Sequence, residues 1–288
     1  MKRLLSIFSA VALSAFVLNC YAQGVEETMF KYPVAPDTCS TLESRCNHIV
    51  VNFWNEFDIA HPIKDDAMFE KTFRDYVNFF KFAHRNIVLS SVRNFVYKAR
   101  ANSANLLKVG AAAEAALYGP NAEFWSDELY VEVAKAMAES SHLKATDRNY
   151  YKHQVEVINK NLEGHEIPSL DIQTSSGKIK INDIEAESFL LFFTDEGAGS
   201  IIDRTRLSTD VGVNRLIEQG GLKVIQIYVG KPAAGWLESQ PETWINGSCD
   251  QVMDLVDVRA IPGCFILNKD RQIVTKNVTV EEVKAAVN

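Results

Sequence analysis

The chain has 288 residues, of which 47% are hydrophobic and 23% are charged, a composition typical of globular proteins with one large or two smaller cores. Its formal net charge is −7, and no cluster of basic residues offsets the acidic excess. Such a surface repels phosphate backbones, which excludes nucleic acid as an expected partner.

The first element in the chain is an apolar run, Leu4–Leu18, preceded by two basic residues. The run is shorter than the roughly 20 residues that a membrane-spanning helix needs. Small residues, Cys20 and Ala22, occupy the two positions that a signal peptidase inspects. The pattern predicts a signal peptide over residues 1–22 and no membrane span. Cleavage there leaves 28 basic and 37 acidic residues, a net charge of −9.

An alternative processing route starts from the sequence Leu18-Asn19-Cys20, which resembles the site at which lipoproteins are acylated on cysteine. Asn19 disfavours this route because such sites have a small residue before the cysteine. A lipid anchor at Cys20 is therefore the second expectation. By either route we expect an exported protein of the periplasm or cell envelope.

From Asp37 to about Leu162, apolar residues recur every three or four positions, which is the period of buried helix faces. This spacing predicts an all-helical domain over residues 23–163, and its aromatic residues are assigned to the core. Ser126 and Thr146 are predicted to cap helices. The clearest helical face comprises Met68, Phe69, Phe73, Tyr76, Val77 and Phe80, and further helices are expected at Asn47–Phe57, Ile87–Arg100, Asn102–Tyr118, Asp127–Ser140 and Asp147–Leu162.

Gly164 ends the last of these helices, and the pattern then changes to short β-rich runs. Helices alternate with the later strands, which predicts a mixed sheet covered by helices over residues 164–288. The expected strands are Ser169–Gln173, Ile179–Ile181, Ser188–Phe193, Leu222–Val229, Gly263–Asn268 and Ile273–Lys276. The expected helices are Ser200–Gln219, Ser248–Val256 and Val280–Val287.

This element order, with Ile261-Pro262 opening the fourth core strand, resembles the thioredoxin fold, in which this proline is cis and faces the start of the first core helix. The resemblance implies an α/β thioredoxin-like domain preceded by an all-helical domain. The entry segment, Gly164-x-x-x-Pro168-x-Leu170 with Gly177, resembles that of bacterial extracytoplasmic thioredoxin-like proteins linked to cytochrome maturation and peroxide reduction. Other segments resemble an uncharacterised exported family in which a helical domain of unknown function precedes a thioredoxin fold: Leu255-x-x-x-Arg259-Ala260-Ile261-Pro262, Leu267-Asn268-Lys269-Asp270, Trp244-Ile245 and Leu117-Tyr118-Gly119-Pro120-Asn121.

Active relatives of this fold carry Cys-x-x-Cys where the first core strand meets its helix. Aligned on that motif, Gly197 stands at the attacking cysteine and Ser200 at the resolving cysteine. Glycine has no nucleophile, and a serine hydroxyl ionises far above neutral pH, so the active site is degenerate and we expect no disulfide exchange there. Ser200 is predicted to be the N-cap of the helix that follows.

The remaining geometry of such a turn predicts a binding groove. Uncovered N–H groups at the helix start would suit an anion or a carboxylate, and the backbone of Ile261 would pair with an extended peptide. Trp236 and Trp244 are candidates for the wall of this groove. We therefore expect a redox-inactive protein that binds a peptide or protein ligand, without a cofactor. The groove residues are Glu196, Gly197, Ala198, Gly199, Ser200, Ile261 and Pro262.

The remaining cysteines support a second hypothesis, a thiol-disulfide oxidoreductase that works through Cys249 or Cys264, or through Cys39 and Cys46 if the N-terminal segment is not helical. If Cys39 and Cys46 share a helix, roughly 10 Å separates them, which is too far for a disulfide. A buried bond between Cys249 and Cys264 remains open. The six histidines show no zinc-ligand spacing, so no metal is expected. A structural component of the cell envelope is the third hypothesis.

Overall fold

The computed structural model describes residues 28–287. The predicted signal peptide and the alternative anchor at Cys20 lie outside this range. Within it, no helix is both long and apolar enough to cross a membrane.

The chain divides into two compact units, one ending at Lys108 and the other beginning at Val109. The division falls within α5 (Ser103–Leu117). Secondary structure changes later in the chain, because the last helix before the sheet ends at Lys160 and the first strand begins at Asp171. The domain boundary expected near Gly164 follows this change of secondary structure and stays a prediction.

The first unit is helical and contains α2 (Leu42–Asn52), α3 (Asp66–Val77), the 3-10 helix η1 (Phe80–Phe82), α4 (Arg85–Ala99) and the start of α5. Aromatic side chains fill its core, as their helical spacing predicts. Trp54 stacks on Phe95 with ring centroids 4.0 Å apart, and both are buried. Phe53, Phe69, Phe73 and Tyr76 surround this pair.

The helix expected over Asn47–Phe57 instead begins at Leu42 and ends at Asn52. Thr41 causes the earlier start, because its hydroxyl accepts a hydrogen bond from the Ser44 N–H while the Ser44 hydroxyl accepts one from Thr41 N–H. Cys39 therefore lies before α2 and Cys46 lies within it, so the assumption of a shared helix is wrong. Both are free thiols.

Two further helices, α6 (Asp127–Ala138) and α7 (Ala145–Lys160), open the second unit after α5. Ser126 caps α6, as predicted, by accepting a hydrogen bond from the Leu129 N–H. The predicted cap at Thr146 is wrong, since α7 begins one residue earlier and Lys144 is its N-cap.

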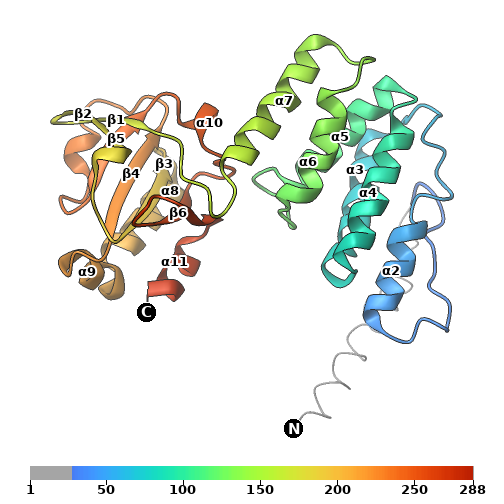
Figure 1. The fold of residues 1–288 in the computed structure, drawn as a ribbon, viewed down its shortest axis with the longest axis horizontal. Helices are drawn as coiled ribbons and strands as arrows, with labels where there is room; N and C mark the ends of the chain where they lie inside the picture. Colours follow the sequence, from blue (N-terminus) through green and yellow to red (C-terminus); the bar gives the residue numbers. More distant parts are fainter. Residues whose placement is uncertain (1–27, 288) are drawn as a thin grey trace, which may run out of the picture. The chain divides into compact units, whose positions relative to one another are not determined.

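A seven-stranded mixed sheet forms the rest of the second unit, in the order β2-β1-β5-β4-β3-β6-β7 (Figure 1). β3 lies between β4, to which it is parallel, and β6, to which it is antiparallel. The sheet as a whole agrees with the expected mixed architecture. The strands are β1 (Asp171–Thr174), β2 (Gly177–Lys180), β3 (Ser188–Thr194), β4 (Lys223–Val229), β5 (Ile245–Cys249), β6 (Gly263–Asn268) and β7 (Ile273–Val278).

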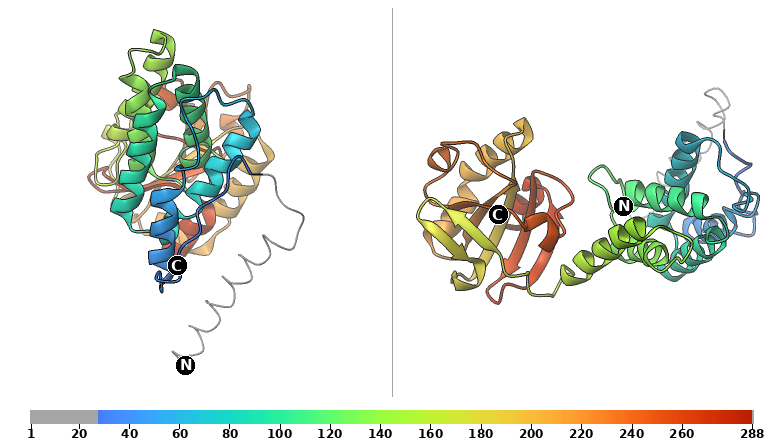
Figure 2. Two further views of the ribbon diagram at one scale, coloured as in Figure 1. Left: turned by 90° about the vertical axis from the view of Figure 1, so that its right-hand side faces the viewer. Right: turned by 90° about the horizontal axis from the view of Figure 1, so that it is seen from above.

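Both faces of this sheet are covered (Figure 2). Leu190 and Phe192 of β3 face one core, which also takes side chains from α8 (Ala198–Ser208), α9 (Val211–Glu218) and α11 (Val280–Val287). Alternate β3 residues, such as Leu191, face the other core, which α10 (Val252–Leu255) and the chain leading into β1 cover. Because successive strand residues point to opposite faces, β3 has no exposed side and reads as a continuous apolar run.

The single helix expected over Ser200–Gln219 is wrong, because the structure divides it into α8 and α9. Asp210 explains the break, since its side chain accepts a hydrogen bond from the Val213 N–H and begins the second helix. The helix expected over Ser248–Val256 is wrong in its first part, because Ser248 and Cys249 end β5 and only α10 is helical there. The sequence of β5, Ile-Asn-Gly-Ser-Cys, carries no apolar alternation that would have revealed it.

Candidate functional site

The turn between β3 and α8 is the centre of the predicted groove. Gly197 is the N-cap of α8, and Ser200 is the third residue of the helix. The prediction of Ser200 as the N-cap is therefore wrong. Its side chain is buried, donates a hydrogen bond to Asp195 Oδ1 at 2.6 Å and accepts one from the Asp195 N–H at 3.1 Å. Ser200 thus fastens the turn to the helix.

Two carboxylates of the turn itself lie at the start of α8. Asp195 Oδ1 accepts a hydrogen bond from the Gly197 N–H at 2.8 Å, and Glu196 Oε1 accepts one from the Ala233 N–H at 3.2 Å. Negative charge is favoured at a helix N-terminus, and these side chains supply it. A second negative charge would be repelled, so the geometry disfavours the anion or carboxylate ligand expected here.

The peptide bond between Ile261 and Pro262 is cis, as the resemblance to thioredoxin implied. A Cβ atom placed on Gly199 would lie 3.3 Å from Pro262 Cδ, so the proline faces the first turn of α8 at close range. The backbone N–H and C=O of Ile261 make no hydrogen bond with residues 28–287. The structure therefore brings the first turn of α8 and Pro262 together and leaves the backbone N–H and C=O of Ile261 without a hydrogen-bond partner among residues 28–287.

A pocket of about 290 Å³ adjoins this turn. Asp195, Glu196, Ile201 and Arg204 form one side, and the segment from Ala233 to Gln240 forms the other. Arg204 Nη1 donates a hydrogen bond to Gln240 Oε1 at 2.7 Å, which joins the two sides. Ile201 and its neighbour Ile202 are 46% and 51% exposed, so α8 presents an apolar surface beside the pocket.

The two tryptophans of the segment after β4 differ in their placement. Trp236 lines the pocket and packs edge-on against Tyr228, with ring centroids 4.9 Å apart. Trp244 is buried in the sheet core beside Phe192. Of the two expected wall residues, Trp236 lines the pocket beside the turn, and the expectation for Trp244 is wrong because its side chain is buried in the core.

The cysteines of the second unit lie on opposite faces of the sheet. Cys249 belongs to the core beneath α10, and Cys264, opposite Phe192 on the neighbouring strand, belongs to the core beneath α8 and α11. Both are free and buried. Desolvation raises the pKa of both thiols, that of Cys264 the more strongly. The sheet itself therefore prevents the disulfide that the sequence left open.

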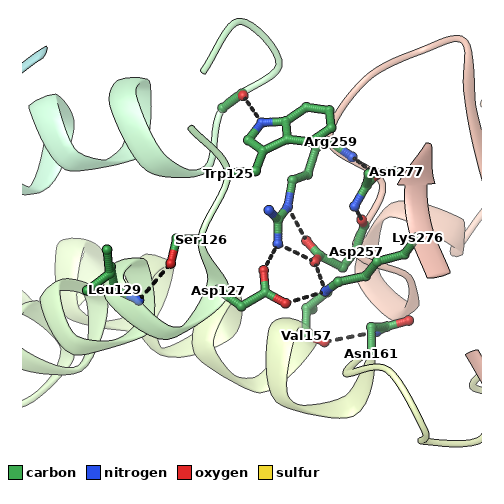
Figure 3. A network of polar contacts seen from close by, with 11 residues as sticks. Trp125, Ser126, Asp127, Leu129, Val157, Asn161, Asp257, Arg259, Lys276 and Asn277 are labelled. Carbon is green, nitrogen blue, oxygen red and sulfur yellow. Dashed lines mark hydrogen bonds and ion pairs between the residues drawn. The ribbon is translucent and has the colours of Figure 1, made fainter. Parts of the chain in front are cut away.

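A buried group of four charges is the most elaborate polar feature of the second unit (Figure 3). The guanidinium of Arg259 pairs with Asp127 at the start of α6 and with Asp257 at 2.8 Å. Lys276 of β7 contacts the same two carboxylates, Asp127 at 2.8 Å and Asp257 at 2.5 Å. The side chain of Asp257 is fully buried, and that of Arg259 is 3% exposed. We call Asp127, Asp257, Arg259 and Lys276 the four-charge cluster.

Neighbouring side chains hold the four-charge cluster in place. The Arg259 guanidinium lies over the rings of Tyr118 and Trp125, with centroids 4.7 and 5.8 Å away. Asn277 accepts a hydrogen bond from the Arg259 N–H and donates one to the Asp257 carbonyl (Figure 3). The chain that leads to Pro262 is thereby fixed to both α6 and β7.

Sequence reasoning missed the four-charge cluster. Arg259 was noticed within a motif, but its partner Asp127 lies more than a hundred residues earlier in the chain, and Lys276, which shares both carboxylates, lies on the last strand. No local spacing connects Asp127 with Arg259. The residues 28–287 hold no group of three His, Cys, Asp or Glu side chains arranged to bind a metal ion.

Comparison with known proteins places these features in context. Residues 16–161 match the protein family described as a domain of unknown function, DUF5106. The chain has no match among curated proteins.

Among solved structures, a thioredoxin-like protein from Bacteroides caccae ATCC 43185 has a TM-score of 0.76 at 22% identity, over 91% of this chain and 99% of that one. The C-terminal domain of an uncharacterized protein from Bacteroides fragilis NCTC 9343 is 24% identical over 44% of this chain and 98% of its own, with a TM-score of 0.42. The thioredoxin domain of a thiol-disulfide oxidoreductase from Bacteroides vulgatus is 17% identical over 44% of this chain and 99% of its own, with a TM-score of 0.37. The first of these confirms the thioredoxin-like fold with its preceding helical region.

Proposed function

The chain belongs to the DUF5106 family, and from that premise we propose that it is an exported, redox-inactive thioredoxin-like protein that binds extended peptides. The binding site is the groove between the first turn of α8 and Pro262. One observation carries this proposal. Gly197 and Ser200 stand where active relatives have their two cysteines, while the helix start and the cis proline facing it are both present.

The chemistry of the turn and of the thiols in the second unit supports redox inactivity. Gly197 has no side chain, and Ser200 is buried with its hydroxyl bonded to Asp195. Disulfide exchange requires an accessible thiolate. Cys249 and Cys264 are buried, and burial raises the pKa of each thiol, so neither supplies that species at neutral pH.

The surface beside Pro262 supports peptide binding. The free backbone groups of Ile261 match the hydrogen-bonding pattern of an extended chain, as in strand addition to a sheet edge. Ile201 and Ile202 offer apolar contact to its side chains. The carboxylates of Asp195 and Glu196 favour a neutral or cationic peptide over an acidic one.

The redox part of the proposal is tested by the reduction of insulin with dithiothreitol as electron source. We expect no acceleration by the purified chain. If the chain accelerates the reduction and Cys249→Ser or Cys264→Ser abolishes the effect, the protein is an oxidoreductase and the proposal is wrong.

The binding part is tested with insulin B chain whose cysteines are alkylated, so that binding is measured without reaction. Isothermal titration should detect binding to the full chain and its loss in the double variant Ile201→Asp, Ile202→Asp. Val211→Asp is the matched control, because Val211 is 80% exposed on α9, outside the groove. Equal binding by the groove variant, or no binding by the native chain, would contradict the proposal.

A further inference from the structure

The chain between α10 and β6 contains the backbone of Ile261, which is the part of the groove expected to pair with a peptide. Residues 257–262, which we call the cis-proline segment, form neither helix nor strand. Val258 and Ile261 pack their side chains against the core beneath α10. Because no regular ladder of hydrogen bonds fixes this segment, its conformation depends on the side chains that hold it.

The first of these side chains comes from the end of α7. Asn161, the C-cap of α7, is fully buried. Its Nδ2 atom donates a hydrogen bond to the Leu255 carbonyl at 2.9 Å and another to the Val157 carbonyl at 2.8 Å. Leu255 is the last residue of α10, so this contact holds the chain just before the cis-proline segment begins.

The connection between α5 and α6, residues 118–126, is closed by hydrogen bonds of its own. The Ser126 N–H donates to the Leu117 carbonyl at 2.9 Å. Trp125 Nε1 donates to the Gly119 carbonyl at 2.7 Å, a bond drawn in Figure 3. Contacts within the connection therefore set its shape.

This connection and the start of α6 present three groups to Arg259 of the cis-proline segment. The rings of Tyr118 and Trp125 lie against the guanidinium, with centroids 4.7 and 5.8 Å away. The Asp127 carboxylate accepts a hydrogen bond from it. Aromatic faces and a carboxylate are the groups that bind a guanidinium most strongly in a site shielded from water. The helical region of the second unit, α5–α7, therefore carries a formed arginine-binding site, which Arg259 fills.

The main chain at Arg259 is held as well as its side chain. The Arg259 N–H donates a hydrogen bond to Asn277 Oδ1 at 3.0 Å, and Asn277 Nδ2 donates one to the Asp257 carbonyl at 2.9 Å. Arg259 lies two residues before Ile261. The helical region and β7 thus both fix the chain immediately before the backbone groups that remain free for a ligand.

We propose that the α5–α6 connection, Asp127 and Asn161 position the cis-proline segment for peptide binding, and that this is one function of the helical region. These residues lie within the match to DUF5106, whereas the segment that they hold lies outside it. Buried ion pairs contribute little net stability compared with well-packed apolar side chains. Their directional contacts, however, fix a geometry that apolar packing would leave less defined.

A segment that is already fixed loses less conformational freedom when a ligand binds. Removal of an anchor should therefore weaken the binding of a peptide without removing any group that touches it. The loss should be about tenfold in affinity for each backbone residue that the ligand must order. The effect on affinity rests on the function proposed for the groove at Pro262, whereas the holding of the segment does not.

The first test compares the affinity of full-chain variants for insulin B chain with alkylated cysteines, measured by isothermal titration well below the unfolding transition of each. We expect Trp125→Ala and Asp127→Ala each to weaken binding about tenfold. Tyr130→Phe is the matched control, because it removes a hydrogen bond to Gln154 within the helical region but leaves the four-charge cluster intact. It should bind like the native chain. Native affinity in both anchor variants would overturn the proposal.

The second test separates positioning from stability. Asp127→Ala combined with Lys276→Met removes one acid and one base, which leaves Asp257 paired with Arg259. Its urea midpoint should lie above that of Asp127→Ala alone, because the buried charges are balanced again. Its affinity should remain low, since Arg259 still lacks the carboxylate of the helical region. Affinity that recovers together with stability would show a merely structural role and overturn the proposal.

The third test needs no ligand. Hydrogen exchange at the Arg259 N–H, followed by NMR, should be faster in Trp125→Ala and Asp127→Ala than in the native chain and in Tyr130→Phe. If the native chain binds no peptide but exchange accelerates as expected, the function proposed for the groove is wrong and the holding of the segment is right. Unchanged exchange in both anchor variants would overturn the inference whether or not the peptide binds.

Discussion

The guanidinium carbon of Arg259 lies 4.7 Å from the ring centroid of Tyr118. Tyr118 directly follows α5, and Arg259 lies three residues before the cis proline. Cation–π contacts are strongest where water is excluded, and both side chains are largely shielded. The contact couples the helical region of the second unit to the chain that forms the predicted peptide groove.

Arg259→Met tests how much the four-charge cluster depends on its buried guanidinium. The substitution leaves Asp127 and Asp257 with Lys276 as their one cation, so we expect a loss of about 3–5 kcal/mol in the free energy of unfolding, measured with urea. Arg206→Met is the matched control, because Arg206 is 53% exposed and its ion pairs should contribute less than about 1 kcal/mol. Similar losses for both variants would show that burial does not govern the effect.

Asp127 should give the protein a specific sensitivity to acid. Burial acts to raise the pKa of this carboxyl, but the charges of Arg259 and Lys276 outweigh it and hold the pKa below the ordinary value. A lowered pKa in the folded state means that the ionised form stabilises the fold. This contribution is complete above the unfolded pKa of about 3.9 and is lost as the pH falls through the lower folded value.

Asp127→Asn should therefore reduce the free energy of unfolding at pH 7 and flatten its decline below about pH 4. Urea titrations at a series of pH values measure both effects. Asp183→Asn, at an exposed aspartate of the same unit, serves as the control. An unchanged acid slope in Asp127→Asn would contradict this assignment.

The start of α8 should accept a disulfide when cysteines are restored. Gly197 is the N-cap and Ser200 is the third helical residue, so Gly197→Cys with Ser200→Cys would place two sulfurs on one helical turn. Asp195 must move slightly, because a Cβ on Gly197 would lie 2.9 Å from its Oδ1. We expect a reversible disulfide in glutathione buffers and measurable reduction of insulin.

Ser200→Cys alone is the control for that variant, because it supplies one thiol without a partner. It should show neither the disulfide nor the activity. If the two introduced thiols remain unreactive toward each other in a folded protein, the alignment of this turn with the thioredoxin motif is wrong.

Fragments of the chain should reveal where the cooperative boundary lies. A fragment of residues 164–288 lacks Asp127, Tyr118 and Trp125. In this fragment Asp257 is the one carboxylate shared by Arg259 and Lys276, and the Arg259 guanidinium loses the two aromatic rings that cover it. We expect a fragment of residues 109–288 to unfold at a higher urea concentration than one of residues 164–288. Equal midpoints would favour the boundary that the change of secondary structure predicts near Gly164.

Much of the fold was predictable because local patterns determine it. A window of a few residues was enough to predict three features: the helix around Phe69 and Phe73, the buried strand β3 and the cis bond at Ile261-Pro262. The strand β5 was not predictable, because its small and polar residues show no alternation. Gly247 allows β5 to lie against β1, where a Cβ would come within 2.5 Å of Ile172 Cγ2.

The candidate groove was predictable only in part. The position of Pro262 against the first turn of α8 followed from the resemblance, whereas the contacts of Ser200 with Asp195 depend on how the turn closes. The pairing of Arg259 with Asp127 depends on tertiary packing between segments far apart in the chain. No property of a short window of sequence specifies such a contact.

The balance of charge in the four-charge cluster has a consequence for the evolution of this protein. Two carboxylates and two cations share one buried site, and each carboxylate contacts both cations. Loss of any one member leaves an unbalanced charge away from water, whereas loss of one acid together with one base does not. We therefore expect that losing one acid and one base together destabilises the protein less than losing either alone. Among related sequences, replacement of Lys276 by a neutral residue should accompany replacement of Asp127.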